Sequence, residues 1–454
     1  MPATCIQRLQ RATPARWLVS AMLVAGLLTL SGCAAPLQPS TAATTSTSPH
    51  APQANGIRLL AQAHIPAGTD VLGSRFGGIS GVDYDARSGQ FWLISDDRAT
   101  LGPVRMYTAR WALANALTSS PQITGMVVLQ GDGGQPFPAP RRGGASAQGG
   151  THSPDTSPET PDAEALRWHP SGHSLWWTSE GDPSRSIGPR LREALPDGRW
   201  ARTLALPPAF EPSQPATPPH QRSGPRNNAS LEGLTFSADG CTAWLAMEMA
   251  WHQDGPRPTV QAPGGPVRIT ALNATTGQAQ QQRAYLPDAV PHARRLPWGP
   301  EVNGVSEILA DGPHHLLVLE RSYSAGAGFG ARLYRVDLRT GSDTLTLPAL
   351  QPGNYTPLQK SLLLDFATLG LGTVDNLEGM TWAEPLPSGE RVLVLVSDDN
   401  FNPAQSTQWL ALAVPASGEN DGVNPAAAGG ERGPSSPTSQ PSPCGAALPV
   451  KEPA

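Results

Sequence analysis

The sequence predicts an all-β protein, a β-propeller with five recognisable blade units. Three observations support this fold class. The 454 residues include 49 Pro and 47 Gly, which interrupt the chain too often for long helices. A two-strand pattern recurs five times along the chain. The second strand of each repeat is apolar on both faces, so neighbouring sheets must cover both of its sides.

Each repeat has the pattern of a β-hairpin. A short apolar strand is followed by a Ser-Gly or Asp-Gly turn and by a strongly apolar returning strand. The five hairpins are Gly78 to Asp97, Asp162 to Glu180, Ala229 to Glu248, Asn303 to Arg321 and Asp375 to Asp399. The turn pairs are Ser88-Gly89, Ser171-Gly172, Asp239-Gly240, Asp311-Gly312 and Ser388-Gly389.

Weaker strands follow the hairpins, for example Met106 to Trp111 and Ile123 to Leu129. Four strands per unit, repeated radially, define a β-propeller. The fifth unit offers only one further strand, Trp409 to Val414, and we expect the N-terminal strand Ile57 to Ala63 to close the ring. Six blades are the alternative, if a degenerate blade lies within a long loop.

The N-terminal sequence predicts export. Arg8, Arg11 and Arg16 precede an apolar stretch from Leu18 to Leu30, which is too short for a permanent membrane span and has the pattern of a signal peptide. The sequence Leu-Ser-Gly-Cys that ends at Cys33 resembles the bacterial lipobox. This resemblance implies lipidation of Cys33, and an ordinary secretory peptide with an incidental cysteine is the alternative.

These features divide the chain into four parts. We expect a lipoprotein signal peptide at 1–33, a flexible tether at 34–55, the propeller at 56–415 and a disordered Pro/Gly/Ser-rich tail at 416–454. The lipid anchor on Cys33 places the protein in the cell envelope. Ala34, where a retention signal would carry Asp, favours the periplasmic side of the outer membrane.

Composition narrows the range of partners. A charged fraction of 15% and a net charge of -5 give no basic surface for nucleic acid. We expect a monomer.

Outside the cytoplasm Cys241 and Cys444 form either a disulfide or two free thiols. The absence of clustered Cys and His in the sequence disfavours a zinc site.

Acidic residues occur at fixed places in the hairpins. Glu164 and Glu180 are 16 positions apart, as are Glu232 and Glu248. The first acid opens a strand and the second closes the returning strand, so both lie at the same end of the blade. Around a ring, this spacing brings one set of carboxylates toward one mouth of the channel: Asp96, Glu164, Glu180, Glu232, Glu248, Glu307, Glu320, Glu378 and Asp398.

Carboxylates gathered in this way repel one another unless cations or N–H groups compensate them. Calcium suits such a group because it takes six to eight oxygen ligands in flexible geometry, whereas transition metals favour imidazole or thiolate. Arg98, Arg185 and Arg321 follow the acids closely and could pair with them or hold an anionic substrate. In the alternative interpretation, the acids only pin adjacent blades through hydrogen bonds.

The hairpins resemble the phytase-like family, which is described as having esterase-like activity. The matching motifs are Leu231-Glu232-Gly233-Leu234, Leu377-Glu378-Gly379-Met380, Ser95-Asp96-Asp97-Arg98 and Ser397-Asp398-Asp399-Asn400, within a region from about Arg58 to Val414. The resemblance implies a β-propeller and, by distant kinship with β-propeller phytases, calcium-assisted hydrolysis of phosphoric esters.

The leading hypothesis is therefore a calcium-dependent phosphoric ester hydrolase that acts on a small anionic ester. Glu232, Glu378, Arg98 and Arg321 are its candidate catalytic residues, and the other acids of the set are its candidate metal ligands. A non-catalytic propeller that binds an envelope ligand or a protein partner is the alternative. A serine esterase is disfavoured because the sequence has no Gly-x-Ser-x-Gly motif between a strand and a helix.

Overall fold

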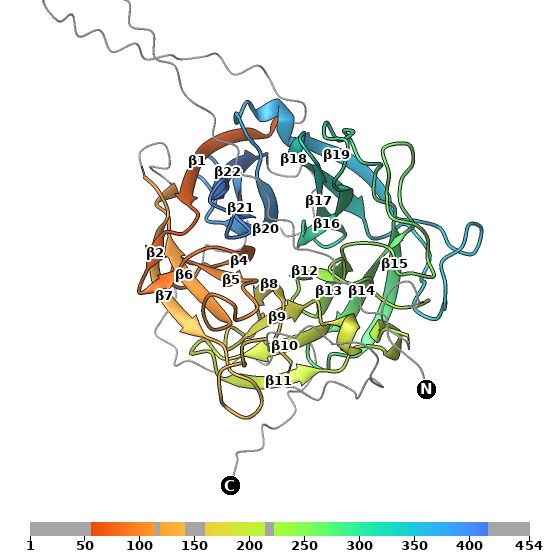
Figure 1. Ribbon diagram of the computed structural model, residues 1–454, viewed down its shortest axis with the longest axis horizontal. Helices are drawn as coiled ribbons and strands as arrows, with labels where there is room; N and C mark the ends of the chain where they lie inside the picture. Colours follow the sequence, from red (N-terminus) through yellow and green to blue (C-terminus); the bar gives the residue numbers. More distant parts are fainter. Residues whose placement is uncertain (1–55, 114–118, 141–158, 214–221, 416–454) are drawn as a thin grey trace, which may run out of the picture. The chain divides into compact units, whose positions relative to one another are not determined.

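The structure, a computed structural model, describes residues 56–113, 119–140, 159–213 and 222–415. These residues form five four-stranded antiparallel sheets arranged around a common axis (Figure 1). The prediction of a five-bladed propeller is confirmed. No helix in the described ranges is long and apolar enough to cross a membrane.

The blades are numbered in chain order. Blade 1 contains β4 (Ile79–Asp85), β5 (Gln90–Ser95), β6 (Arg105–Arg110) and β7 (Gln122–Val128). Blade 2 contains β8 (Ala163–Trp168), β9 (Leu175–Ser179), β10 (Arg190–Ala194) and β11 (Trp200–Leu204). Blade 3 contains β12 (Leu231–Phe236), β13 (Thr242–Met247), β14 (Val267–Asn273) and β15 (Ala279–Tyr285).

Blade 4 contains β16 (Glu301–Ala310), β17 (His315–Ser324), β18 (Gly328–Asp337) and β19 (Gln359–Asp365). Blade 5 contains β20 (Asn376–Ala383), β21 (Arg391–Asp398), β22 (Ser406–Val414) and β1 (Arg58–Pro66). Short elements complete the described structure: β2 (Asp70–Val71), β3 (Ser74–Arg75) and the 3-10 helices η3 (Pro183–Arg185), η4 (Pro208–Phe210) and η5 (Phe366–Leu369).

The N-terminal strand closes the ring, as the sequence predicts. β1 pairs antiparallel with β22, from Arg58 opposite Ala413 to Pro66 opposite Ser406. The last blade is thus built from both ends of the propeller region. Buried Ala61 of β1 packs in the same apolar cluster as Trp409 of β22 and Phe91 of β5, so the closing strand also joins blade 5 to blade 1.

The predicted turns connect the inner two strands of every blade. The glycines of the five Ser-Gly and Asp-Gly turns have φ angles between 64 and 84°, a region that residues with a Cβ rarely adopt. The outer strands of blade 2, β10 and β11, were not predicted. Their sequences, Arg-Leu-Arg-Glu-Ala and Trp-Ala-Arg-Thr-Leu, carry charged residues in place of a clear apolar alternation.

A β-bulge interrupts the innermost strand of every blade, near its first residue in blades 1, 2, 3 and 5 and in the middle of the longer β16 in blade 4. In β12 the register passes from Leu231 to Gly233, which leaves Glu232 without a partner on β13. Four other inner strands shift at the equivalent place: between Ile79 and Gly81, between Ala163 and Leu166, between Val305 and Glu307, and between Leu377 and Gly379. The bulge re-aims the side chain of the extra residue.

One buried ion pair connects all five blades at the axis. Arg167 of blade 2 donates from Nη2 to Glu307 Oε2 of blade 4 at 2.7 Å. The same guanidinium donates to Val82 O of blade 1 at 2.6 Å and to Met380 O of blade 5 at 2.9 Å. Glu307 Oε1 accepts the N–H of Leu234 of blade 3 at 3.0 Å. We call these groups the axial hub.

Several expectations from the sequence concern residues that the structure does not describe. These are the signal peptide and tether, the lipidation of Cys33 and the tail from residue 416. Cys241 lies at the turn before β13 and is disulfide-bonded, and its expected partner Cys444 lies outside the described residues.

We predict that the axial hub stabilises the propeller more than any surface ion pair. Glu307→Ala leaves Arg167 charged and unpaired in a buried site, which should lower the free energy of unfolding by about 3–5 kcal/mol. Glu307→Gln should cost less because its amide oxygen still accepts the N–H of Leu234. Urea unfolding measures both effects.

The matched control is Glu390→Ala, which removes a surface pair with Arg58 and should lower the free energy of unfolding far less, because solvent screens an exposed pair. Equal losses for Glu307→Ala and Glu390→Ala would contradict the role of the hub.

Candidate functional site

Three positions per blade face the same mouth of the ring. The first is the bulge residue of the inner strand, such as Glu232. The second lies on the returning strand, one residue after the partner of the residue that precedes the bulge. In blade 3 it is Glu248, which follows Met247, the partner of Leu231. The third is the residue opposite that second position, and in blade 3 it is Ser230. The sequence therefore repeats one site geometry five times.

The residues at these positions differ sharply between blades. In chain order the five triplets are Gly78, Ser80 and Asp96; Asp162, Glu164 and Glu180; Ser230, Glu232 and Glu248; Gly304, Ser306 and Arg321; Asn376, Glu378 and Asp398. Blade 2 contributes three carboxylates, blades 3 and 5 two each, and blade 1 one. Blade 4 contributes none and places an arginine where the other blades have an acid.

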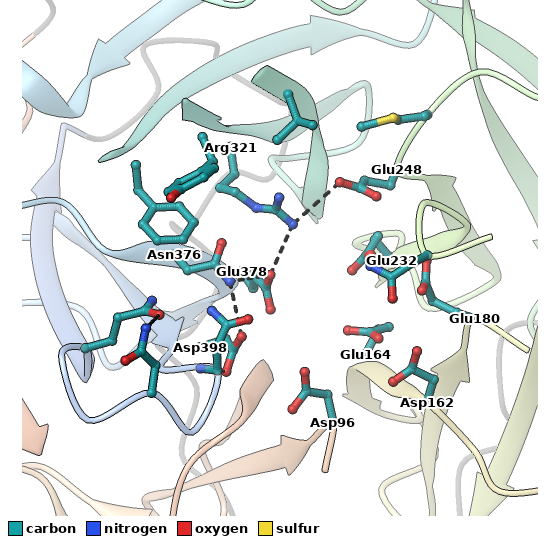
Figure 2. Close-up of a pocket in the computed structure, with 18 of the residues that line it drawn as sticks. Asp96, Asp162, Glu164, Glu180, Glu232, Glu248, Arg321, Asn376, Glu378 and Asp398 are labelled. Carbon is teal, nitrogen blue, oxygen red and sulfur yellow. Dashed lines mark hydrogen bonds and ion pairs between the residues drawn. The ribbon is translucent and has the colours of Figure 1, made fainter. Parts of the chain in front are cut away.

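The eight acids, Arg321 and Asn376 of these triplets converge on one cavity of about 790 Å3 (Figure 2). It is lined by eight carboxylates and three arginines, a formal excess of five negative charges. The acids are Asp96, Asp162, Glu164, Glu180, Glu232, Glu248, Glu378 and Asp398, and the arginines are Arg98, Arg257 and Arg321. Seven of the nine predicted acids and two of the predicted arginines thus line one cavity.

Protein groups compensate the acids unevenly. In blade 5, Glu378 accepts from Arg321 at 3.1 Å and from Asn376 at 2.9 Å, and Asp398 accepts the N–H of Asn400 at 2.6 Å. Within the described residues, no group donates a hydrogen bond to the carboxylate of Glu232, and the same holds for those of Asp96 and Glu164. The charge that the protein leaves unbalanced is therefore concentrated at blades 1 to 3.

The acids of blades 2 and 3 form two groups that share Glu180. Asp162, Glu164 and Glu180 each offer a carboxylate oxygen within 4.8 Å of the others, and so do Glu180, Glu232 and Glu248. Three contacts reach these groups: the Ser230 N–H donates to Glu180 at 2.5 Å, Arg98 lies 3.2 Å from Asp162, and Arg321 lies 3.5 Å from Glu248.

Burial and mutual repulsion raise the pKa values of these acids. Burial raises the pKa of Glu164 well above its usual value, and the charge of Glu232 adds to the effect. The pKa of Glu232 is raised well above its usual value by burial and by Glu180. Burial raises the pKa of Asp162 to about 6, although the charge of Arg98 opposes this. Without a cation, the cluster holds protons that exposed carboxyl groups would release.

Arg321 is the cation at the centre of the acid ring. Its Nη2 lies 3.5 Å from Glu248 and 3.1 Å from Glu378, between the acids of blades 3 and 5 (Figure 2). Burial opposes its charge, but Glu248 and Glu378 hold its pKa above the usual value. Its Nε has no hydrogen-bond partner among the described residues. The guanidinium thus retains donors for a further acceptor.

The Ser-Asp-Asp motifs divide their two acids between two tasks. The first acid, Asp96 or Asp398, lines the cavity. The second acid holds the following loop, because Asp97 accepts the N–H of Leu101 at 2.7 Å and Asp399 accepts those of Gly78 and Phe401 at 2.9 and 3.0 Å. The motif therefore both places a carboxylate in the cavity and fixes the rim of the mouth.

Two predicted site residues lie elsewhere. Glu307 belongs to the axial hub, where burial raises its pKa to about 7 against the opposing charge of Arg167. Glu320 accepts from Tyr285 at 2.5 Å and from Lys360 and Asn303, each at 2.7 Å, and so joins blades 3 and 4. Each is one residue away from the position that faces the mouth, because blade 4 carries Ser306 at its bulge and Arg321 on β17. For these two acids the blade-pinning interpretation fits. Arg185, in η3, is not among the residues that line the cavity.

Sequence reasoning also missed residues that line the cavity. Asp162 and Asn376 occupy the third position of blades 2 and 5, two residues before the bulge acid. The spacing of two residues between each of them and the following acid was visible in the repeats. That this spacing brings both residues to the mouth depends on the bulge, which the sequence does not reveal. Arg257 and Asn228 come from loops without a repeat signal.

The donor chemistry of the cavity fits a hard divalent cation. The possible metal ligands at blades 2 and 3 are carboxylate oxygens, which calcium prefers. A second observation supports this. Asn376 is 4% exposed and donates from Nδ2 to Glu378 and Asp398, but its Oδ1 accepts no hydrogen bond in the described structure. A buried acceptor without a donor calls for a further partner, such as a water molecule or a cation.

Several known proteins resemble parts of this chain. A stretch of 59 residues is 36% identical to an uncharacterized secreted protein of Arthroderma benhamiae, covering 13% of this chain and 12% of that protein. A Coprinopsis cinerea GH62 α-L-arabinofuranosidase catalytic domain matches with a TM-score of 0.37, 10% identity, and coverage of 79% of this chain and 99% of that one. A putative glucose dehydrogenase of Thermus thermophilus matches with a TM-score of 0.34, 9% identity, and coverage of 78% and 99%. At these TM-scores the likenesses identify no common site.

The family comparison is more extensive. The phytase-like family, described as "Esterase-like activity of phytase", matches residues 74–401. The match begins at the rim of blade 1, ends in the loop after Asp399 and contains all of the acids that line the cavity. The chain belongs to the phytase-like family.

Proposed function

We propose that this protein is a calcium-dependent phosphoric ester hydrolase that acts at the acidic mouth of its propeller. The observation that carries the proposal is the set of buried carboxylates that the protein leaves without a counter-charge, above all Glu164 and Glu232. Membership of the phytase-like family supports a hydrolase of this general type.

Electrostatics favours a cation-loaded cavity. A phosphoric ester is an anion, and a cavity with five excess negative charges repels it. Two divalent cations would reduce the excess to one charge, and the two carboxylate groups that share Glu180 offer two places for them. Protonation alone would lower the charge but would add no positive charge beside these acids to attract the ester.

Calcium bound between these carboxylates would polarise the phosphoryl oxygens and lower the pKa of a neighbouring water. Asp162, Glu164, Glu180, Glu232 and Glu248 would hold it, with Asp96 on the adjoining blade. The site supplies only oxygen ligands there, which suits calcium rather than a transition metal.

The remaining tasks fall to side chains of the chain itself. Arg321 presents donors toward the cavity from the side opposite the unpaired acids, and so is placed to orient an ester oxygen. Glu378 keeps Arg321 in place through their 3.1 Å contact. Glu232 accepts no hydrogen bond from the described residues, so its second carboxylate oxygen is suited to take up the proton that water loses. Arg98, paired with Asp162 at the rim, is a second anion ligand.

The alternative, a propeller that only binds a ligand, requires that protein groups neutralise the acids. Blade 5 fits this description, because each of its two acids has a donor. Blades 1 to 3 do not, since Asp96, Glu164 and Glu232 accept no hydrogen bond from the described residues. This difference favours the metal-dependent enzyme.

The proposal includes a place outside the cytoplasm, with a lipid anchor on Cys33 and the outer membrane as its site. Support comes from the lipobox-like sequence that ends at Cys33 and from the short similarity to a secreted protein. Mass spectrometry of the mature N-terminus tests it, because an unmodified Cys33 or an uncleaved leader would overturn the anchor and leave the enzyme proposal unaffected.

We predict saturable calcium binding that depends on the unpaired carboxylates. Glu164→Gln combined with Glu232→Gln removes two charges without breaking a hydrogen bond of the fold, and should weaken calcium binding at least about tenfold because ligand charge sets affinity. Calorimetric titration of the metal-free protein measures this. Hydrolysis of 4-nitrophenyl phosphate should require calcium and fall in parallel.

Glu390→Gln, on the surface and outside the cavity, is the matched control and should bind calcium normally. Absence of calcium binding by the unaltered protein would sink the metal-dependent proposal and favour the binding propeller.

We further predict an unusual pH dependence of stability. The acids of the cluster have pKa values raised by folding, so the stability that they contribute is complete below their unfolded pKa and is lost as the pH rises through their folded pKa, about 6 for Asp162. The chelator-treated protein should therefore melt at a lower temperature at pH 8 than at pH 5. Calcium should raise the melting temperature more at pH 8. Equal effects of calcium at both pH values would contradict the titration of this cluster.

Arg321→Gln should separate cation binding from substrate binding. Removing a positive charge beside Glu248 and Glu378 should tighten calcium binding. Losing a charged hydrogen bond, about 1.5–3 kcal/mol, should raise the KM for the ester about 10- to 100-fold. Arg321→Lys, which keeps the charge but loses the planar fork, should retain the calcium affinity and only part of the substrate affinity. An unchanged KM in Arg321→Gln would remove Arg321 from the substrate site.

A further inference from the structure

Blade 4 extends beyond the mouth and builds an apolar wall there. Its first three strands have ten residues each, whereas the first three strands of blades 1 to 3 have five to seven. The extra length lies at the cavity end, because Glu301 pairs with Ser324 and Ser324 pairs with Gly328 beyond the level of Arg321. The glycine-rich segment at 326–330 thus belongs to an ordered hairpin from Gly328 onward.

Three side chains stand in one row across this extension. Val302 lies opposite Tyr323, and Tyr323 lies opposite Phe329, so the three point to the same face of the sheet. The rings of Tyr323 and Phe329 are 4.7 Å apart and tilted by 48°. All three residues line the cavity, together with buried Met249 from blade 3.

The wall has a fixed relation to Arg321. Arg321 lies two residues before Tyr323 on β17, so both side chains are on the same face, about 7 Å apart along the strand at roughly 3.3 Å per residue. The cross-strand neighbours of Arg321 are Gly304, whose lack of a side chain leaves room for Glu248, and Ala331. An anionic group at Arg321 would therefore have flat apolar surface one step closer to the opening.

The rest of the rim has a different character. Asn228, Asn400, Asn402 and Gln405 present amides to the cavity. A bound ligand would therefore meet charged groups at the floor of the cavity, one apolar wall over blade 4 and polar groups elsewhere. A uniformly hydroxylated substrate would leave the wall unused.

We propose that the preferred substrates are phosphoric monoesters of alcohols that carry a flat apolar ring close to the ester oxygen. This inference rests on the proposed function. The phosphoryl group occupies the site beside Arg321, and the ring packs against Val302, Tyr323 and Phe329. Tyr323 and Phe329 are thus specificity-determining residues that take no part in the chemistry.

The test compares two non-hydrolysable anions, benzylphosphonate and methylphosphonate, by calorimetry on the calcium-loaded protein. Benzylphosphonate should bind about tenfold more tightly, because its ring leaves water for an apolar surface. In Tyr323→Ala combined with Phe329→Ala this preference should fall to less than about threefold, with the affinity for methylphosphonate unchanged. Tyr323→Leu combined with Phe329→Leu keeps the wall apolar and guards against loss of the hairpin, and should show an intermediate preference.

Trp298→Ala is the control for rings that bind to any exposed aromatic residue. Trp298 is 71% exposed and is not a cavity-lining residue, so its removal should leave the preference intact. Equal binding of both phosphonates by the unaltered protein would overturn this inference alone. Binding of neither, together with absence of ester hydrolysis, would overturn the proposed function and this inference with it.

Discussion

The arrangement of the mouth depends on the ion pair between Arg167 and Glu307. A buried ion pair is not by itself a source of stability, since the loss of hydration offsets much of the attraction. Here it fixes geometry, because its hydrogen bonds reach Val82, Leu234 and Met380 on the three other inner strands. With one group from each blade held at a single level, the five inner strands cannot slide independently. The bulges, a few residues away along each strand, then present their side chains at a common height.

The mouth combines a symmetric frame with an asymmetric set of side chains. Five blades repeat the same three positions, and the difference between binding a cation and binding an anion lies in what occupies them. Blade 2 fills all three with acids, whereas blade 4 replaces its acid with Arg321 and adds an aromatic wall above it. Burial and repulsion make the acidic side costly for the folded chain, a pattern typical of functional sites rather than of structural cores. Arg321 offsets part of that cost, most of all for Glu248 and Glu378.

The fold could be predicted because its determinants are local. The turn glycines, the apolar returning strands and the count of five hairpins are all visible in the sequence, and so is the spare N-terminal strand. Most of the mouth followed from the spacing of Glu164, Glu180, Glu232 and Glu248. The side chains that blade 4 contributes to the mouth could not be predicted from this spacing. A bulge shifts the register by one residue, and a shift of one residue turns a side chain to the other face. Glu307 and Glu320 were acids at nearly the right spacing. Only the strand pairing in the structure shows that Ser306 and Arg321 occupy the positions to which the sequence analysis assigned Glu307 and Glu320.

The pairing of β1 with β22 has a consequence for how the chain acquires its structure. The strand that is made first completes the blade that is made last, so its contacts span nearly the whole propeller. Contacts of such long sequence separation slow folding, and the ring gains its full cooperativity only when residue 414 is available. Until then β22 or β1 presents an open strand edge, which can pair with another chain. A protein truncated within blade 5 should therefore be prone to aggregate during biogenesis even though four of its blades are intact.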